Sequence, residues 1–160
     1  CYGHFSMAMR GVGTEDPVTF DYCNFKSPGQ NAAHNAFVHN RLSGHLEGFQ
    51  GIPVVITDTI LTGYSGTTIG DSFSAEQIAN WNANSSGDYI AFRDNGTNHH
   101  ASLTTLTNLH TADPQLPSAV GQDVAGWRVQ SGSPVLTAGS GGGEIGLNNG
   151  TNWAASVAGY

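Results

Sequence analysis

The stretch DYIAFRDNGTNHHASL, residues 88–103, carries the strongest indication of fold in this chain. Two runs suited to β-strands, Asp88–Arg93 and Asn98–Leu103, flank the tetrapeptide DNGT at 94–97. Asn and Gly both tolerate the positive φ angles of a type I′ turn, so Asn-Gly between extended runs is the strongest short-range signal for a β-hairpin. We therefore predict an antiparallel hairpin at this place.

The same turn chemistry recurs near the other end of the chain, in NNGT at residues 148–151. The nonapeptides that begin at Asn95 and Asn149, NGTNHHASL and NGTNWAASV, are identical at six of nine positions. Two explanations stay open, the reuse of a favourable turn sequence and the duplication of a structural unit. Either one adds a second predicted hairpin.

Residues 4–10 and 17–24 also alternate between apolar and polar side chains, with a turn composition at 11–16 between them. A register in which Arg10 faces Pro17 places three apolar pairs on one face, as a half-buried antiparallel hairpin requires. Those pairs are Met9 with Val18, Met7 with Phe20, and Phe5 with Tyr22. The pattern predicts a hairpin at this end of the chain too.

The two cysteines, Cys1 and Cys23, favour a disulfide and an oxidising environment. A bond that closes this loop would stabilise the fold by roughly 3 kcal/mol in the chain-entropy model. In the hairpin register Cys23 lies across from His4, so the bond would clamp the chain end onto the hairpin and would not belong to the core. Two free thiols, a lipid anchor on Cys1 and an N-terminal nucleophile are the alternatives.

A capping box gives the clearest local signal for a helix, in FSAEQI at residues 73–78. The Ser74 hydroxyl can accept from the amide of Gln77 while the Gln77 side chain reaches back, and the flanking Phe and Ile are spaced as a hydrophobic staple. The signal predicts a helix from Ala75 to about Asn82.

Other stretches give plainer patterns. Ile52–Leu61 is β-branched and lies between glycines, which predicts a buried strand. A short helix is predicted at 31–42, and further strands at 124–130, 134–137 and 152–158. Short strands with a turn signal about every ten residues are typical of antiparallel sandwiches. We predict one mainly β domain over residues 1–160, an antiparallel β-sandwich of jelly-roll-like form with one or two short helices.

The composition narrows the range of partners. Only 11% of residues are charged, and the net charge is −7. Nucleic-acid binding needs clustered cations, and the five cations here are scattered singly, so the sequence argues against a nucleic-acid partner. No apolar run reaches the roughly 20 residues that cross a bilayer. Low charge with abundant Gly, Ser, Thr and Asn favours an extracellular, cell-surface or virion location. The cations are Arg10, Lys26, Arg41, Arg93 and Arg128.

No sequence motif of a catalytic or cofactor site is recognised. Seven histidines are many for this length, but their spacing matches no helix-borne zinc motif. A metal site assembled from distant loops stays open, as does one structural calcium ion held by Asp94, Asp113 or Asp123. No cofactor is expected, and the balance favours a non-enzymatic role while leaving enzyme activity open.

Aromatic side chains and asparagines supply the remaining candidate site residues. Trp127, Trp153 and Tyr64 are candidates for stacking on sugar rings. Acceptor sequons for N-glycosylation begin at Asn84, Asn95 and Asn149.

The sequence as a whole favours a structural or adhesive subunit that acts outside the cell or on a virion. Such a subunit would belong to a filament, fibre or capsid and would associate with copies of itself. A carbohydrate-binding, lectin-like module is the first alternative, with glycans as partners. A small secreted enzyme that depends on a metal is the second.

Overall fold

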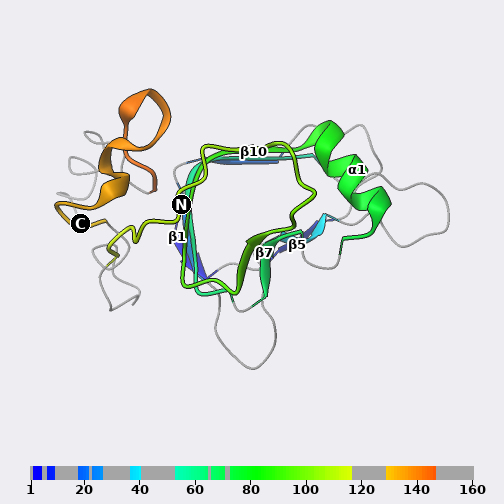
Figure 1. The fold of residues 1–160 in the computed structure, drawn as a ribbon, viewed down its shortest axis with the longest axis horizontal. Helices are drawn as coiled ribbons and strands as arrows, with labels where there is room; N and C mark the ends of the chain where they lie inside the picture. Colours follow the sequence, from blue (N-terminus) through cyan, green and yellow to red (C-terminus); the bar gives the residue numbers. More distant parts are fainter. Residues whose placement is uncertain are drawn as a thin grey trace.

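Parallel pairing between distant strands dominates the computed structural model of the chain (Figure 1). The structure describes residues 2–4, 7–9, 18–21, 23–26, 37–40, 53–64, 66–70, 73–116 and 129–146. All described strand pairs are parallel, and they form two sheets accompanied by one α-helix.

The strands of each sheet come from successive passes of the chain. The six-stranded sheet runs in the order β1 (Tyr2–His4), β4 (Asn24–Lys26), β6 (Val54–Thr62), β8 (Ser86–Arg93) and β10 (Leu106–Thr107), with β3 (Val18–Asp21) also paired with β6. The four-stranded sheet runs β2 (Met7–Met9), β5 (Phe37–Asn40), β7 (Thr67–Ile69) and β9 (Thr97–His99). Each strand of the second sheet follows one of the first along the chain, so the described strands form a stack of coils, a parallel β-solenoid.

Figure 1 shows the coils overlying one another as a ring, with β1 and β10 on one sheet and β5 and β7 on the other. The inside of the ring is filled by apolar side chains. Fully buried members of this core include Ile56, Leu61, Tyr64 and Ile90. Phe92 belongs to the same core and is 2% exposed. A continuous core of stacked coils therefore replaces the single interface between two facing sheets of a sandwich.

Two residues with a left-handed backbone conformation lie at the point where β6 changes its neighbouring strand in the first sheet. Strand β3 pairs with Val54–Thr57, whereas β4 pairs with Ile60–Thr62, so the neighbouring strand changes at Asp58. Asp58 has φ 43° and Tyr89, level with it on β8, has φ 52°. Such a backbone costs an L-residue roughly 1–2 kcal/mol, so the stacking of the coils must hold it in place.

Helix α1 (Ala75–Asn84) leaves the coil between β7 and β8. Its capping box is formed: the Gln77 amide donates to the Ser74 hydroxyl over 3.3 Å, and the Ser74 amide donates to the Gln77 side chain over 2.8 Å. Trp81 is fully buried and lies with its ring 6.0 Å from that of Phe73. Both the predicted helix and its capping box are confirmed.

A segment at 129–146, called here the docked segment, covers the outside of the first sheet (orange in Figure 1). It contains two short 3-10 helices, η2 (Pro134–Thr137) and η3 (Ser140–Gly142). Val135 and Ile145 of this segment form a second apolar cluster with Ile60 and Ala91, which point outward from β6 and β8, and with Leu116. The solenoid thus has one core inside the coils and another beneath the docked segment.

The Asp58 carboxylate anchors the docked segment. It accepts hydrogen bonds from the Ser140 amide over 2.8 Å and from the Ser140 hydroxyl over 2.6 Å. A Cβ atom on Gly139 would lie 2.4 Å from Asp58 Oδ1, so no larger residue fits there without displacing the carboxylate.

The predicted antiparallel β-sandwich or jelly roll is wrong, because the described strands pair in parallel. The predicted hairpin at 88–103 is also wrong, because β8 and β9 belong to different sheets and do not pair with each other. The hairpin predicted at 4–10 and 17–24 is wrong as well, since β1 pairs with β4, and β3 with β6. Alternation shows which side chains share a face, but it is equally compatible with parallel neighbours.

The cysteine prediction is also revised. Cys23 is 2% exposed and belongs to the core inside the coils, and it is not opposite His4, which pairs with Lys26. Cys1 lies outside the described residues, so the predicted bond between Cys1 and Cys23 falls outside what the structure describes. The predicted clamp on an N-terminal hairpin is wrong, because that hairpin does not form.

Four further element predictions have mixed outcomes. The buried strand at Ile52–Leu61 is confirmed as β6. The predicted helix at 31–42 is wrong where it is described, because Phe37–Asn40 is a strand. Pro134–Thr137 forms a 3-10 helix and not a strand. The closing strand at 152–158 lies outside the described residues.

Candidate functional site

A polar pocket of about 230 Å³ lies at the corner where β8 ends. Its walls come from two pieces of chain, residues 92–98 at the corner itself and residues 111–113, which follow the last described coil. The lining residues are Phe92, Arg93, Asp94, Asn95, Asn98, Thr111 and Asp113.

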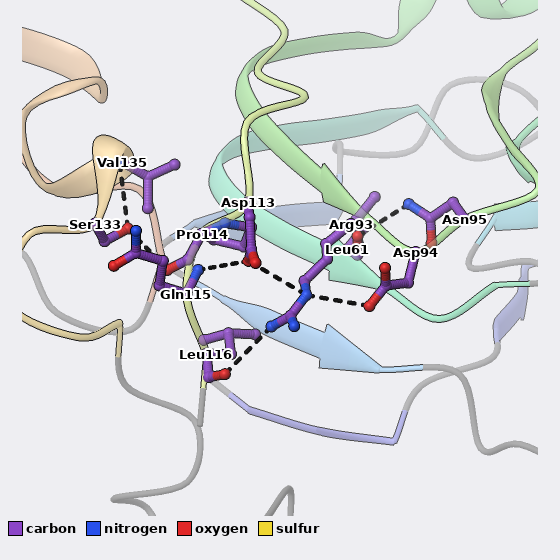
Figure 2. A network of polar contacts seen from close by, with 10 residues as sticks. All are labelled: Leu61, Arg93, Asp94, Asn95, Asp113, Pro114, Gln115, Leu116, Ser133 and Val135. Carbon is purple, nitrogen blue, oxygen red and sulfur yellow. Dashed lines mark hydrogen bonds and ion pairs between the residues drawn. The ribbon is translucent and has the colours of Figure 1, made fainter. Parts of the chain in front are cut away.

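Arg93 is the central side chain of the pocket (Figure 2). Phe92 points into the coil, and Arg93, as the next residue of the strand, points outward. The Nε of Arg93 lies 3.1 Å from Asp94 Oδ2 and 3.3 Å from Asp113 Oδ1. Its Nη1 donates to the Leu116 carbonyl over 3.2 Å. One guanidinium thus holds two carboxylates and a backbone carbonyl together.

The turn after Arg93 fixes one wall. Asp94 has φ 54°, a conformation that Asp and Asn adopt more readily than most residues. Asn95 donates from Nδ2 to the Leu61 carbonyl and accepts at Oδ1 from the Tyr64 amide, each over 3.0 Å. The side chain of Asn95 therefore ties this corner to the preceding coil.

Asp113 forms the opposite wall through an Asx turn. Its Oδ1 accepts from the Gln115 amide over 2.7 Å as well as facing Arg93. The side chains of Asp94 and Asp113 remain 73% and 58% exposed, whereas that of Arg93 is only 28% exposed. Both carboxylates can therefore reach a bound molecule while the guanidinium supports them from behind.

The charges and bonding groups of the pocket indicate the class of ligand it fits. Two carboxylates and one guanidinium give a formal charge of −1, which disfavours an anion. Carboxylates only accept hydrogen bonds, whereas guanidinium and amide N–H groups donate them. A neutral ligand that offers closely spaced donors and acceptors, such as a sugar with adjacent hydroxyls, matches this set. The volume lies below the roughly 300–1,000 Å³ of pockets for drug-sized ligands, so one ring fits better than a chain of them.

The candidate residues named from the sequence are distributed as follows. Tyr64 is fully buried inside the coils, where burial raises the pKa of its phenol above the ordinary value, so its ring does not lie on a surface. Its backbone serves the pocket instead, since the Tyr64 carbonyl accepts from the Gly96 amide over 2.7 Å. Trp127, Trp153 and Asn149 lie outside the described residues.

The two described sequons differ in their surroundings. Asn84 is exposed at the end of α1, where its Nδ2 donates to Asn80 Oδ1 over 2.9 Å. Asn95 uses both its oxygen and its nitrogen in the corner described above. A glycan on Asn95 would replace one of the two hydrogens on Nδ2, the atom that donates to the Leu61 carbonyl.

Sequence reasoning missed the pocket because it joins residues that are distant along the chain. The sequence suggests Asp94 and Asp113 only as calcium ligands, and the structure brings both onto Arg93. Within the described part of the chain, no group of three or more His, Cys, Asp or Glu is placed to hold a metal ion. In the sequence, Arg93 is marked only by its position beside the Asn-Gly turn.

Among the described residues, no helix has the length and apolar character needed to cross a membrane.

The chain matches no protein-family model, and no curated protein and no solved structure is significantly similar to it.

Proposed function

We propose that this chain is a non-enzymatic adhesive module, acting outside the cell or on a virion surface, that binds a neutral carbohydrate in the Arg93 pocket. The observation that carries the proposal is the pair of exposed carboxylates, Asp94 and Asp113, held on one guanidinium. Together with Asn98 and Thr111 they present acceptors and donors around a space of about 230 Å³. Stacked coils give such a pocket a rigid support, which lowers the ordering cost of binding.

Saturation-transfer NMR against a panel of neutral monosaccharides, followed by calorimetry on the best ligand, tests this proposal. Asp94→Asn is the sharpest variant, because Asn tolerates the left-handed backbone at this position and only the charge and one acceptor change. We expect it to weaken binding about tenfold, as befits a lost hydrogen bond to a charged group.

Glu76→Gln is the matched control, since it removes the same charge from an exposed position on α1, away from the pocket. It should leave the affinity unchanged. A native chain that binds no neutral sugar, or an Asp94→Asn variant that binds as tightly as the native chain, would contradict the proposal.

Self-association is the second candidate function, and the stacking of the coils favours it. Successive coils pair through the same parallel pattern, for example Val55–Thr57 with Ser86–Asp88 and Gly87–Asp88 with Leu106–Thr107. A coil from a second copy of the chain would offer the same backbone N–H and C=O groups to an unpaired strand edge of the first copy. Size-exclusion chromatography with light scattering over a wide range of concentration tests it, and a strictly monomeric chain would refute it.

A further inference from the structure

Residues 113–116, called here the connector, lie between the pocket and the docked segment and are bonded to both (Figure 2). On the pocket side, Asp113 faces Arg93 Nε at 3.3 Å and the Leu116 carbonyl accepts from Arg93 Nη1 at 3.2 Å. On the other side, the Ser133 hydroxyl donates to the Pro114 carbonyl over 2.7 Å, and the Gln130 amide donates to the Gln115 carbonyl over 3.1 Å. The connector is thus held from two sides, by Arg93 of the pocket and by the docked segment.

Burial strengthens the contacts on the side of the docked segment. Pro114 and Leu116 are buried, and Leu116 packs in the second apolar cluster with Val135 and Ile145. Ser133 is 6% exposed, and its hydroxyl also accepts from the Val135 amide over 3.3 Å. A hydrogen bond in such a place is costly to leave unmade, so the docked segment and the connector are expected to move together.

The backbone of the connector depends on that support. Gln115 has φ 54°, a left-handed conformation that a Gln side chain does not favour. Asp113 Oδ1 holds the Gln115 amide on one side, while the docked segment holds the Gln115 carbonyl on the other. Loss of the second support would let the connector relax and carry the Asp113 carboxylate away from Arg93.

We propose that the docked segment sets the geometry of the Arg93 pocket, with Ser133 as a positioning residue and the contact between Asp58 and Ser140 as the anchor that keeps the segment in place. The predicted effect on affinity rests on the proposed carbohydrate function, whereas the structural coupling does not. Coupling of this kind is reciprocal, so a ligand that fixes Asp113 must also stabilise the docking of the segment.

Amide hydrogen exchange by NMR and sugar titration, carried out on the same variants of the full chain, test the proposal. Ser133→Ala removes the bond to Pro114, and we expect it to speed exchange of the Gln115 amide and to weaken sugar binding, each about fivefold. Ser140→Ala acts at the opposite end of the segment and on an exposed side chain, and it should shift both quantities in the same direction.

Ser74→Ala is the matched control, because it also deletes a hydroxyl that accepts from a backbone amide, but on α1. It should leave Gln115 exchange and sugar affinity unchanged at a similar loss of overall stability. Saturating sugar should slow exchange of the Gln130 amide in the native chain.

Unchanged Gln115 exchange in Ser133→Ala, or an equal change in Ser74→Ala, would overturn the coupling. A native chain that binds no sugar would refute the carbohydrate function alone, because the exchange measurement still decides whether the segment positions the connector.

Discussion

At the scale of single residues, Tyr64 shows that the fold, and not the residue type, decides whether an aromatic side chain lies in the core or on the surface. An aromatic ring beside a Gly-rich turn fits a surface that stacks on sugars, yet here the ring lies inside the coils and only the backbone serves the pocket. The phenol is removed from water, and this burial raises its pKa. The consequence is a dependence of stability on pH.

We predict that the free energy of unfolding falls as the pH rises above about 10, the ordinary pKa of tyrosine. The unfolded chain then loses the Tyr64 proton while the folded chain keeps it, so the contribution that is fully present below pH 10 is lost as the pH rises, by up to about 1.4 kcal/mol for each pH unit. Urea denaturation at pH 8 to 11 measures the slope. Tyr64→Phe should flatten it, and an identical slope in the variant would contradict the assignment.

At the scale of elements, α1 is the part of the fold that depends most on local sequence. Its first turn is closed by the reciprocal bonds between Ser74 and Gln77. These bonds satisfy backbone amides that have no partner within the helix. Both bonds join residues three positions apart in the sequence, which is why the helix is recognisable before any tertiary contact is known.

We expect Ser74→Ala to lower the free energy of unfolding by about 1 kcal/mol, because an orphan amide at the start of α1 loses its acceptor. Ser74→Asp supplies another capping oxygen and should restore most of that loss. Urea denaturation of the three proteins measures both changes. A variant with alanine that is as stable as the native chain would show that packing of Trp81 alone maintains the helix.

At the scale of the whole molecule, the two apolar clusters predict two units that open separately. Ile56 belongs to the core inside the coils, and Ile60 belongs to the cluster beneath the docked segment. Both side chains are fully buried in the same strand, so they form a matched pair.

We predict that Ile56→Ala and Ile60→Ala each cost about 2–5 kcal/mol, the usual loss for a buried isoleucine. Their effects on hydrogen exchange should differ, because stability is distributed over cooperative units. Ile56→Ala should speed exchange throughout the stacked strands, whereas Ile60→Ala should act mainly on amides of residues 129–146. The same exchange pattern in both variants would mean that the docked segment and the coils unfold as one unit.

The elements that depend on interactions between residues close in the chain were determined by the sequence alone. The capping box placed α1, and the β-branched run between glycines placed the buried strand β6. Both depend on interactions among residues close in the chain. Alternation likewise showed where short strands would lie, because a strand has one face toward the core whichever neighbour it pairs with.

Only the tertiary structure decided which strands pair and what the Arg93 pocket contains. Thr57 pairs with Asp88, and β4 pairs with both β1 and β6, contacts that no local signal specifies. The Asn-Gly turn does not form a hairpin here, because β8 and β9 belong to different sheets, and Asn95 instead bonds to the preceding coil through Leu61 and Tyr64. Asp113 reaches Arg93 because the stacking of coils brings the two segments to one corner, and that stacking is fixed by the burial of side chains distant in sequence.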